Sequence, residues 1–244
     1  MSSTLLNESR YLFMVLAALL AVRKSPYSKV MRIRNGGSLL ALGLASSTAL
    51  LGLGAIVLGG RTADFDGRVR AQFPRYRRSR TKRHAKSLGP LGKTWLHLPI
   101  TGGVAAYLLL KKKGADSAVT VMTSALAASA VSDAFEKFLP RRHAPWGRFE
   151  FTEPSFPSGH ALRASTVSLV TAYVLVRENV GNREIHVPVA LSVPLSTALH
   201  ALYFDRHWAT DIIGGWLGAA ALGSACAAGY EVAQARKKAE VPKK

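Results

Sequence analysis

Acidic residues and cysteine are scarce in this chain. Its 14 Asp and Glu stand against 33 Lys and Arg, which gives a formal net charge of +19. The single cysteine, Cys226, lies inside an apolar run, so an intramolecular disulfide is excluded and the redox compartment is not indicated. The chain also contains no internal repeat and no low-complexity linker.

Apolar residues are abundant, at 48% of the chain, and the mean hydropathy is +0.13. A soluble nucleic-acid-binding protein can be this basic, but it does not also carry long runs without charge. Here the basic residues are segregated from the apolar runs, a pattern typical of membrane proteins with basic loops. The composition therefore indicates an integral membrane protein.

Several segments are long and apolar enough to cross a bilayer, for which about 20 residues suffice, within a range of roughly 17 to 25. These six segments are residues 35–60, 94–110, 117–135, 160–176, 185–204 and 212–230. We therefore expect an all-α integral membrane bundle of six transmembrane helices within a domain spanning 35–230. A basic N-terminal segment, 1–34, precedes it, and a basic tail, 231–244, follows it.

The N-terminal segment contains a shorter apolar run, Tyr11–Val22, flanked by Arg10 and Arg23. Its length and its basic flanks predict a helix that lies in the membrane interface. A secretory signal peptide is the competing interpretation, but no small-residue cleavage site follows the run. We therefore expect this helix to be retained in the mature protein.

Small residues recur in the last span, where Gly214 and Gly218 form a GxxxG pattern with Gly215 and Ala219 beside them. Small residues at this spacing allow two helix backbones to approach closely. Packing within the same chain is the ordinary explanation of such a pattern, and dimerisation is the less common one.

Residues capable of chemistry gather in the connections that follow the odd-numbered spans. Lys137, Arg141 and Arg142 follow the third span, Ser158–His160 open the fourth, and His207–Asp211 precede the sixth. Connections after odd-numbered spans lie at the same membrane face, so we expect these residues to form one site.

The sequence Phe156-Pro157-Ser158-Gly159-His160 opens the fourth span. The Ser158 hydroxyl is suited to cap the helix, and Gly159 leaves backbone N–H groups accessible to an anion at the helix N-terminus. His160, in the first turn, can exchange a proton with a bound group. A helix cap followed by an incidental histidine explains the same residues, because short motifs often match by chance.

His207 and Asp211 are four residues apart and share a face if the segment is helical. A carboxylate that accepts from one ring nitrogen fixes the tautomer and leaves the other nitrogen free for nucleophilic attack. The pair also fits two metal ligands or a structural ion pair. We expect neither a metal nor a cofactor, because no cysteine and few carboxylates accompany the pair in these connections.

Three cations near these residues are candidates for phosphate binding: Lys137, Arg142 and Arg163. Arginine suits bidentate contact with phosphoryl oxygens. Lys137 also follows Asp133 at the spacing of an ion pair within a helix. Arg163 lies inside a span, three residues after His160, and is either a functional residue or a side chain that snorkels to the interface.

In order and spacing, these elements resemble the three signatures of the type 2 phosphatidic acid phosphatase superfamily, KxxxxxxRP, PSGH and SRxxxxxHxxxD. The resemblance implies metal-independent hydrolysis of a phosphomonoester or diphosphate. It implies that His207 is a nucleophile that forms a phosphohistidine, that Asp211 orients it, and that His160 protonates the leaving alkoxide. Lys137, Ser158 and the Gly159 amide would be phosphate ligands. The expected location is the plasma (inner) membrane, with the site at the extracytoplasmic face.

Both signature arginines are missing. Ala144 and Ala201 occupy their positions, and His200 replaces the serine before Ala201. A donor that stabilises transition-state charge contributes on the order of 10²–10³ in rate. We expect Arg142 and Arg163 to take over phosphate binding. The alternative is a catalytically degenerate relative that binds or moves anionic lipids.

The run Arg75–Lys86 contains seven Lys or Arg in twelve residues. A nucleic-acid patch is one interpretation of such a run. Beside a bilayer, binding to anionic membrane lipids is favoured, since each cation contributes about 1 kcal/mol near an anionic surface. The expected partners are therefore a lipid phosphate substrate and anionic lipids, with no nucleic acid. Lys and Arg are divided evenly between the two sides of the six spans, so charge alone does not assign the orientation.

Overall fold

The computed structural model describes residues 36–73, 88–139 and 155–240. Its α-helices are α3 (Gly36–Leu58), α4 (Ala63–Gln72), α6 (Thr94–Leu110), α7 (Ala115–Phe138), α8 (Gly159–Arg177), α9 (Arg183–Tyr203) and α10 (Ala209–Glu240), and η1 (Gly89–Gly92) is a 3₁₀ turn. Within these ranges there is no strand, which confirms the expected all-α class. The expected interfacial helix Tyr11–Val22 and the basic run Arg75–Lys86 lie outside the described residues.

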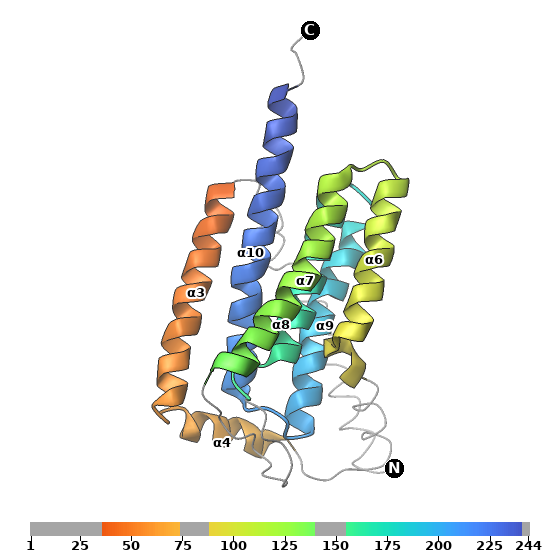
Figure 1. Cartoon of the computed structure of the whole chain (residues 1–244). Coiled ribbons are helices and arrows are strands. Elements are labelled where there is room, and N and C mark those ends of the chain that lie inside the picture. The colour runs from red at the N-terminus through yellow and green to blue at the C-terminus, as the bar shows by residue number, and fades with distance from the viewer. Residues whose placement is uncertain (1–35, 74–87, 140–154, 241–244) are drawn as a thin grey trace, which may run out of the picture.

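Each expected span corresponds to one long helix, and these helices run alongside one another in a bundle (Figure 1). Helix α6 has the bounds expected from the sequence, and most of the other long helices differ from expectation by a few residues at their ends. Helix α10 is the exception, because it continues well past Tyr230 to Glu240. Most of the expected basic tail, 231–244, is therefore a continuation of the last helix.

Four of the described helices are long and apolar enough to cross a membrane by length and composition: α3, α7, α9 and α10. Helix α6 is apolar but has 17 residues. Helix α8 is more polar, and it buries Arg163, Ser165 and Thr166 among its neighbours. A helix enclosed by other helices does not face lipid, so it need not be apolar all round. Six membrane crossings remain a prediction, and four of the six helices have the length and composition of a span.

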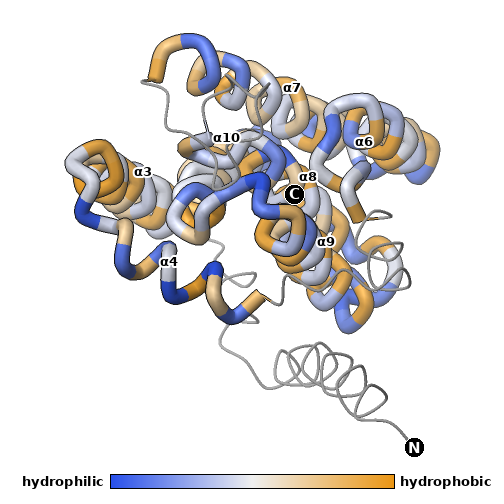
Figure 2. The backbone as a smooth tube through the Cα atoms, turned by 90° about the horizontal axis from the view of Figure 1, so that it is seen from below, coloured by the Kyte–Doolittle hydropathy of each residue, from blue (hydrophilic) through white to orange (hydrophobic). Residues whose placement is uncertain are grey.

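Helices α8 and α10 lie at the centre of the bundle. Seen from the end at which α4 lies, α8 and α10 are surrounded by α3, α7, α6 and α9 (Figure 2). Helix α8 packs against α7, α9 and α10, whereas α3 packs against α10. The outer face of α3 exposes leucines such as Leu44 (72%) and Leu51 (76%), as expected of a helix whose outer surface contacts lipid tails.

Prolines lie inside α9 without ending it. Pro194 has no N–H, so the carbonyl of Ala190, four residues earlier, loses its partner within the helix. The Ser168 hydroxyl of α8 donates to that carbonyl at 3.0 Å. Neighbouring hydroxyls commonly satisfy such freed carbonyls in membrane helices. The sequence of α8 thus compensates for the proline in α9.

At the end of the bundle away from α4, a buried polar network joins α8 to α10. The Arg177 guanidinium donates to both carboxylate oxygens of Glu231, at 2.6 and 2.7 Å. The Tyr173 hydroxyl donates to the same carboxylate at 2.6 Å. Glu231 is 8% exposed, so this pair is largely shielded from solvent and fixes α10 against α8.

Candidate active site

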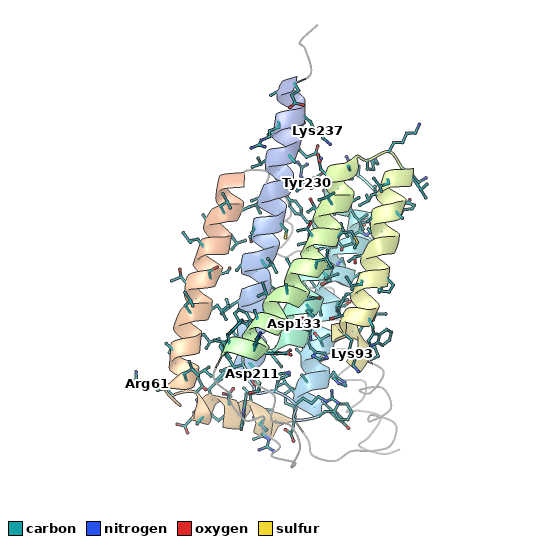
Figure 3. All side chains as sticks on the ribbon, viewed as in Figure 1. Arg61, Lys93, Asp133, Asp211, Tyr230 and Lys237 are labelled. Carbon is teal, nitrogen blue, oxygen red and sulfur yellow. The ribbon has the colours of Figure 1, made fainter. Side chains whose placement is uncertain are left out.

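The elements that carry the expected site residues meet at one end of the bundle. In Figure 3, Asp133 and Asp211 lie toward this end, whereas Tyr230 and Lys237 lie toward the other. The Ser158 backbone N–H donates to the Asp211 carbonyl at 2.9 Å, which joins the start of α8 to the start of α10. The structure therefore brings together the starts of α8 and α10, two of the three segments that the sequence predicted to converge, whereas Arg141 and Arg142 lie outside the described residues.

The loop that bears His207 begins where α9 ends. The Arg206 N–H donates to the Ala201 carbonyl at 2.9 Å and the Asp205 N–H to the Leu202 carbonyl at 3.2 Å. This pair of bonds is a Schellman motif, which requires a residue of positive φ after the helix. Asp205 supplies it, with φ of 53°. The loop therefore leaves α9 in a defined direction, and His207 follows two residues later.

Helix α10 begins at Ala209, two residues after His207. The Asp211 carboxylate accepts a hydrogen bond from the Trp208 backbone N–H at 2.9 Å, as the acidic residue of a capping box does. Asp211 is fully buried. This bond fixes the carboxylate in the first turn of α10, on the side where His207 lies.

The Nδ1 atom of His207 faces two oxygens. It lies 3.0 Å from the Ser155 backbone carbonyl and 3.6 Å from the Asp211 carboxylate. A carbonyl oxygen only accepts, so Nδ1 carries the proton and donates to Ser155. In the neutral imidazole with this tautomer, the Nε2 atom holds the lone pair that a nucleophile requires. The carbonyl of Ser155 was not foreseen from the sequence, because a backbone partner has no sequence signature.

The start of α8 has the form of an anion site. The Ser158 hydroxyl accepts from the Ala161 N–H at 3.4 Å, which confirms the expected cap. Within the described part of the chain, no acceptor contacts the backbone N–H groups of Gly159 and His160. Free amides at a helix N-terminus favour an anion.

Glycines bring this segment into place. A side chain at Gly214 would come within 2.6 Å of the Phe156 ring, and one at Gly215 within 2.6 Å of the Ser158 carbonyl. A Cβ on Gly159 would overlap the Ser132 hydroxyl of α7. The small residues expected to serve helix packing therefore admit the Phe156–Gly159 segment between α7 and α10, within this chain.

Three histidines surround η1, which the sequence did not indicate as part of the site. A Cβ on Gly92 would lie 2.6 Å from His160 Cβ, and one on Gly89 would lie 2.9 Å from the His200 ring. His97 lies in the first turn of α6, which follows η1 directly, and it is buried. The Nε2 atoms of His97 and His160 are buried without a partner among the described residues. The turn η1 therefore forms one wall of the site.

Arg163 points from α8 toward α7. Its guanidinium donates to the Ser132 hydroxyl at 2.9 Å and lies 3.4 Å from the Asp133 carboxylate and 4.0 Å from that of Glu136. Asp133 thus contacts Arg163, whereas its expected pair with Lys137 is not among the ion pairs of the described residues. Arg163 is 8% exposed, so it is not a snorkelling side chain, and its Nε has no partner in the described ranges.

The remaining expected cations are less defined. Lys137 lies in the last turn of α7, exposed, with its ammonium 5.3 Å from the Phe138 ring centroid. Arg142 and Ala144 lie outside the described residues. Ala201 is buried, and it packs in a cluster with Ala161, Ala198 and Ile212.

Among the described residues, no three His, Cys, Asp or Glu side chains gather as a metal site would require.

This end of the bundle defines a class of protein: an integral membrane helical protein in which a half-buried histidine lies beside a buried carboxylate, next to the start of a helix. Residues 113–234, half of the chain, match the PAP2 superfamily. The chain belongs to the PAP2 superfamily, which confirms the family expected from the sequence. No curated protein sequence matched the chain.

A solved structure has the same fold. It is described as the crystal structure of the first transmembrane PAP2 type phosphatidylglycerolphosphate phosphatase from Bacillus subtilis. The two chains are 17% identical and superpose with a TM-score of 0.68, over 83% of this chain and 99% of that one. The match supports the transmembrane bundle and covers nearly all of the solved protein.

Proposed function

We propose that this protein is a membrane phosphatase that hydrolyses a lipid phosphomonoester or diphosphate through a phosphohistidine. One observation carries the proposal: His207 Nδ1 donates to the Ser155 carbonyl beside the buried Asp211 carboxylate, which leaves Nε2 as a nucleophile. Membership of the PAP2 superfamily and the fold of a solved lipid phosphate phosphatase support the same reaction class.

In the proposed reaction, His207 Nε2 attacks the phosphorus atom, and the bond from phosphorus to the leaving oxygen breaks. Asp211 stabilises the positive charge that forms on the imidazole ring. His160 gives a proton to the leaving alkoxide and later takes one from the water that attacks the phosphohistidine. Inorganic phosphate leaves and His207 returns to its first state, so that no metal or cofactor is needed in these steps.

The start of α8 is proposed to bind the phosphoryl group. The amides of Gly159 and His160 supply donors, with Ser158 fixing the first turn. Arg163 and Lys137 are proposed to add positive charge, together with Arg142 from outside the described residues. Arg163 is held by Ser132 and Asp133, which supports an ordered guanidinium next to the site.

A lipid substrate follows from the placement of the site. Apolar helices flank it, and a phosphate at the end of such helices would belong to a headgroup. The solved relative is described as acting on phosphatidylglycerolphosphate, so that lipid heads the list of candidates, followed by phosphatidate and a polyprenyl diphosphate. We also propose that the site faces the extracytoplasmic side of the plasma (inner) membrane, and that Arg75–Lys86 contacts anionic lipid.

A second function is supported by Ala201. It is 5% exposed and packs against apolar neighbours in the position where the signature of the family has an arginine. Without that cation, the protein would bind or move anionic lipids and would not hydrolyse them.

The deciding experiment measures phosphate release from the three candidate lipids by the full chain, purified in detergent, in EDTA. The His207→Ala variant is the control. Release by the wild-type protein that is lost in the control supports the phosphatase. Lipid binding without release from any of the three would overturn it and favour the second function. Retained release in His207→Ala would show that another group is the nucleophile.

A further inference from the structure

Helix α4 contacts the loop that bears His207 on both sides of that histidine. Before it, the Arg70 guanidinium donates to the Asp205 carboxylate through Nε at 3.0 Å and through Nη2 at 3.5 Å. After it, the Asp66 carboxylate accepts from Thr210, through the backbone N–H at 3.0 Å and the hydroxyl at 2.8 Å. Figure 1 shows α4 lying across this end of the bundle, near the start of α10.

Asp66 supplies the side-chain hydrogen-bond acceptor that the first turn of α10 lacks. Trp208 occupies the N-cap position, since its carbonyl accepts the first helical bonds, from Asp211 and Ile212. An N-cap residue normally accepts from the second or third N–H of the helix, and a Trp side chain has no acceptor. Asp66 accepts from the second, that of Thr210, 144 residues along the chain. Its negative charge at the helix N-terminus also complements the helix dipole.

Arg70 fixes the other side of the loop. Its partner Asp205 is the residue in the left-handed conformation that ends α9, so the ion pair acts on the residue that sets the direction of the loop. The Arg70 guanidinium also lies 5.9 Å from the centroid of the Trp208 ring. Arg70 therefore contacts residues on either side of Arg206 and His207.

Helix α4 is not held by an apolar core. Asp66 is the only buried residue of the helix, at 1% exposed, whereas Phe65 is 41% exposed. A helix that served packing alone would bury an apolar face. The polar contacts to the His207 loop are therefore what place α4 against the bundle.

We propose that Asp66 and Arg70 are positioning residues that fix the orientation of His207 from outside the superfamily signatures. The inference rests on the proposed function for its kinetic consequence, but the orientation of His207 can be measured without catalysis. Neither residue needs to touch substrate, because each acts through the loop.

The test compares Asp66→Asn and Asp205→Gly with a matched control, Asp64→Asn. Asp64 lies on the same helix, exposed to solvent, so its variant makes the same charge change away from the loop. Glycine at 205 retains the left-handed conformation and removes only the carboxylate that pairs with Arg70. Each full-length variant is purified in detergent, and its thermal unfolding is recorded first.

Two readouts follow. The first is the rate at which diethylpyrocarbonate modifies His207, followed by mass spectrometry, which needs no catalytic activity. The second is kcat and KM for phosphate release from the most active lipid. For both test variants we expect a changed His207 modification rate, and kcat lowered about tenfold to hundredfold, since a displacement of about 1 Å can cost 10²-fold. KM should stay within about twofold of the wild-type value, because substrate binding is left intact.

Three results would overturn the inference. The first is a His207 modification rate in both test variants equal to that in Asp64→Asn. The second is a lowered unfolding temperature with normal kcat at a temperature where the protein is folded, which would assign α4 to stability alone. The third is a rise in KM with unchanged kcat. If the wild-type protein releases no phosphate, the proposed function fails, and the modification rates still decide the inference.

Discussion

A methyl group added at Gly92 should displace His160. Gly92 ends η1, and a Cβ built on it lies 2.5 Å from His160 Cδ2 and 2.6 Å from His160 Cβ. Carbon atoms in contact keep about 3.5–4.0 Å apart, so the two must separate by about 1 Å. Rotation of the His160 side chain moves Cδ2 but not Cβ. The backbone of η1 or of the first turn of α8 therefore has to move.

For Gly92→Ala we expect kcat for phosphate release to fall about tenfold to hundredfold, because a displacement of about 1 Å at a reacting group can cost 10²-fold. The overpacking should also lower the free energy of unfolding by about 1–3 kcal/mol. Backbone conformation adds no strain, since φ of Gly92 is not in the left-handed region.

The matched control is Gly102→Ala in α6. A Cβ at Gly102 would meet no atom within 4 Å, and alanine in a helix interior is favoured over glycine by roughly 0.5–1 kcal/mol. Phosphate release is measured for both variants and the wild type in the same detergent, below their unfolding temperatures. A Gly92→Ala protein with the kcat of Gly102→Ala would refute the reasoning, because His160 would then tolerate displacement or η1 would not contact it.

Three further predictions concern other parts of the bundle. Glu231→Gln should lower the free energy of unfolding by about 2–3 kcal/mol, because charge-assisted bonds to Arg177 are lost. The kcat at the distant site should stay unchanged. An unchanged thermal unfolding temperature would contradict this prediction. Gly215→Ala should unfold at a much lower temperature than its control, Gly229→Ala. A Cβ at Gly215 would lie 2.6 Å from the Ser158 carbonyl oxygen and 2.8 Å from Ala161 Cβ, which cannot rotate aside, whereas a Cβ at Gly229 meets nothing within 4 Å. Equal unfolding temperatures would be the contrary result. Arg163→Ala should lower phosphate release about 10²-fold if its guanidinium stabilises phosphoryl charge; undiminished release would assign Arg163 to the contact between α7 and α8.

The sequence by itself determined the class of fold and the meeting of the starts of α8 and α10. Apolar runs long enough to cross a membrane predict helices directly, because few other structures can span a bilayer. The ends of α6 were therefore expected to the residue. The residues Ser158 and Gly159, and the pair His207 and Asp211, were also singled out as candidates from the sequence, since each motif lies within one short segment.

The sequence did not reveal the contacts between segments that are distant in the chain. Asp66 caps α10 from 144 residues away, and its own neighbourhood in the sequence shows an ordinary short polar helix. The glycines of η1 have no motif, because their role is defined by the histidines that pack against them. The Ser155 carbonyl that fixes His207 is a backbone atom, which every residue possesses.

The same division applies to Arg163. Its position inside an apolar span marked it as a functional candidate, because a charge in a membrane helix is costly and is kept for a purpose. Only the packing of α8 against α7 decided which groups hold it: the Ser132 hydroxyl and the Asp133 carboxylate. Local patterns specify which residues form helices and where charge is unusual. The partners of each polar group depend on how the helices pack, because hydrogen bonds between helices require atoms that only the tertiary fold brings within 3 Å or so of each other.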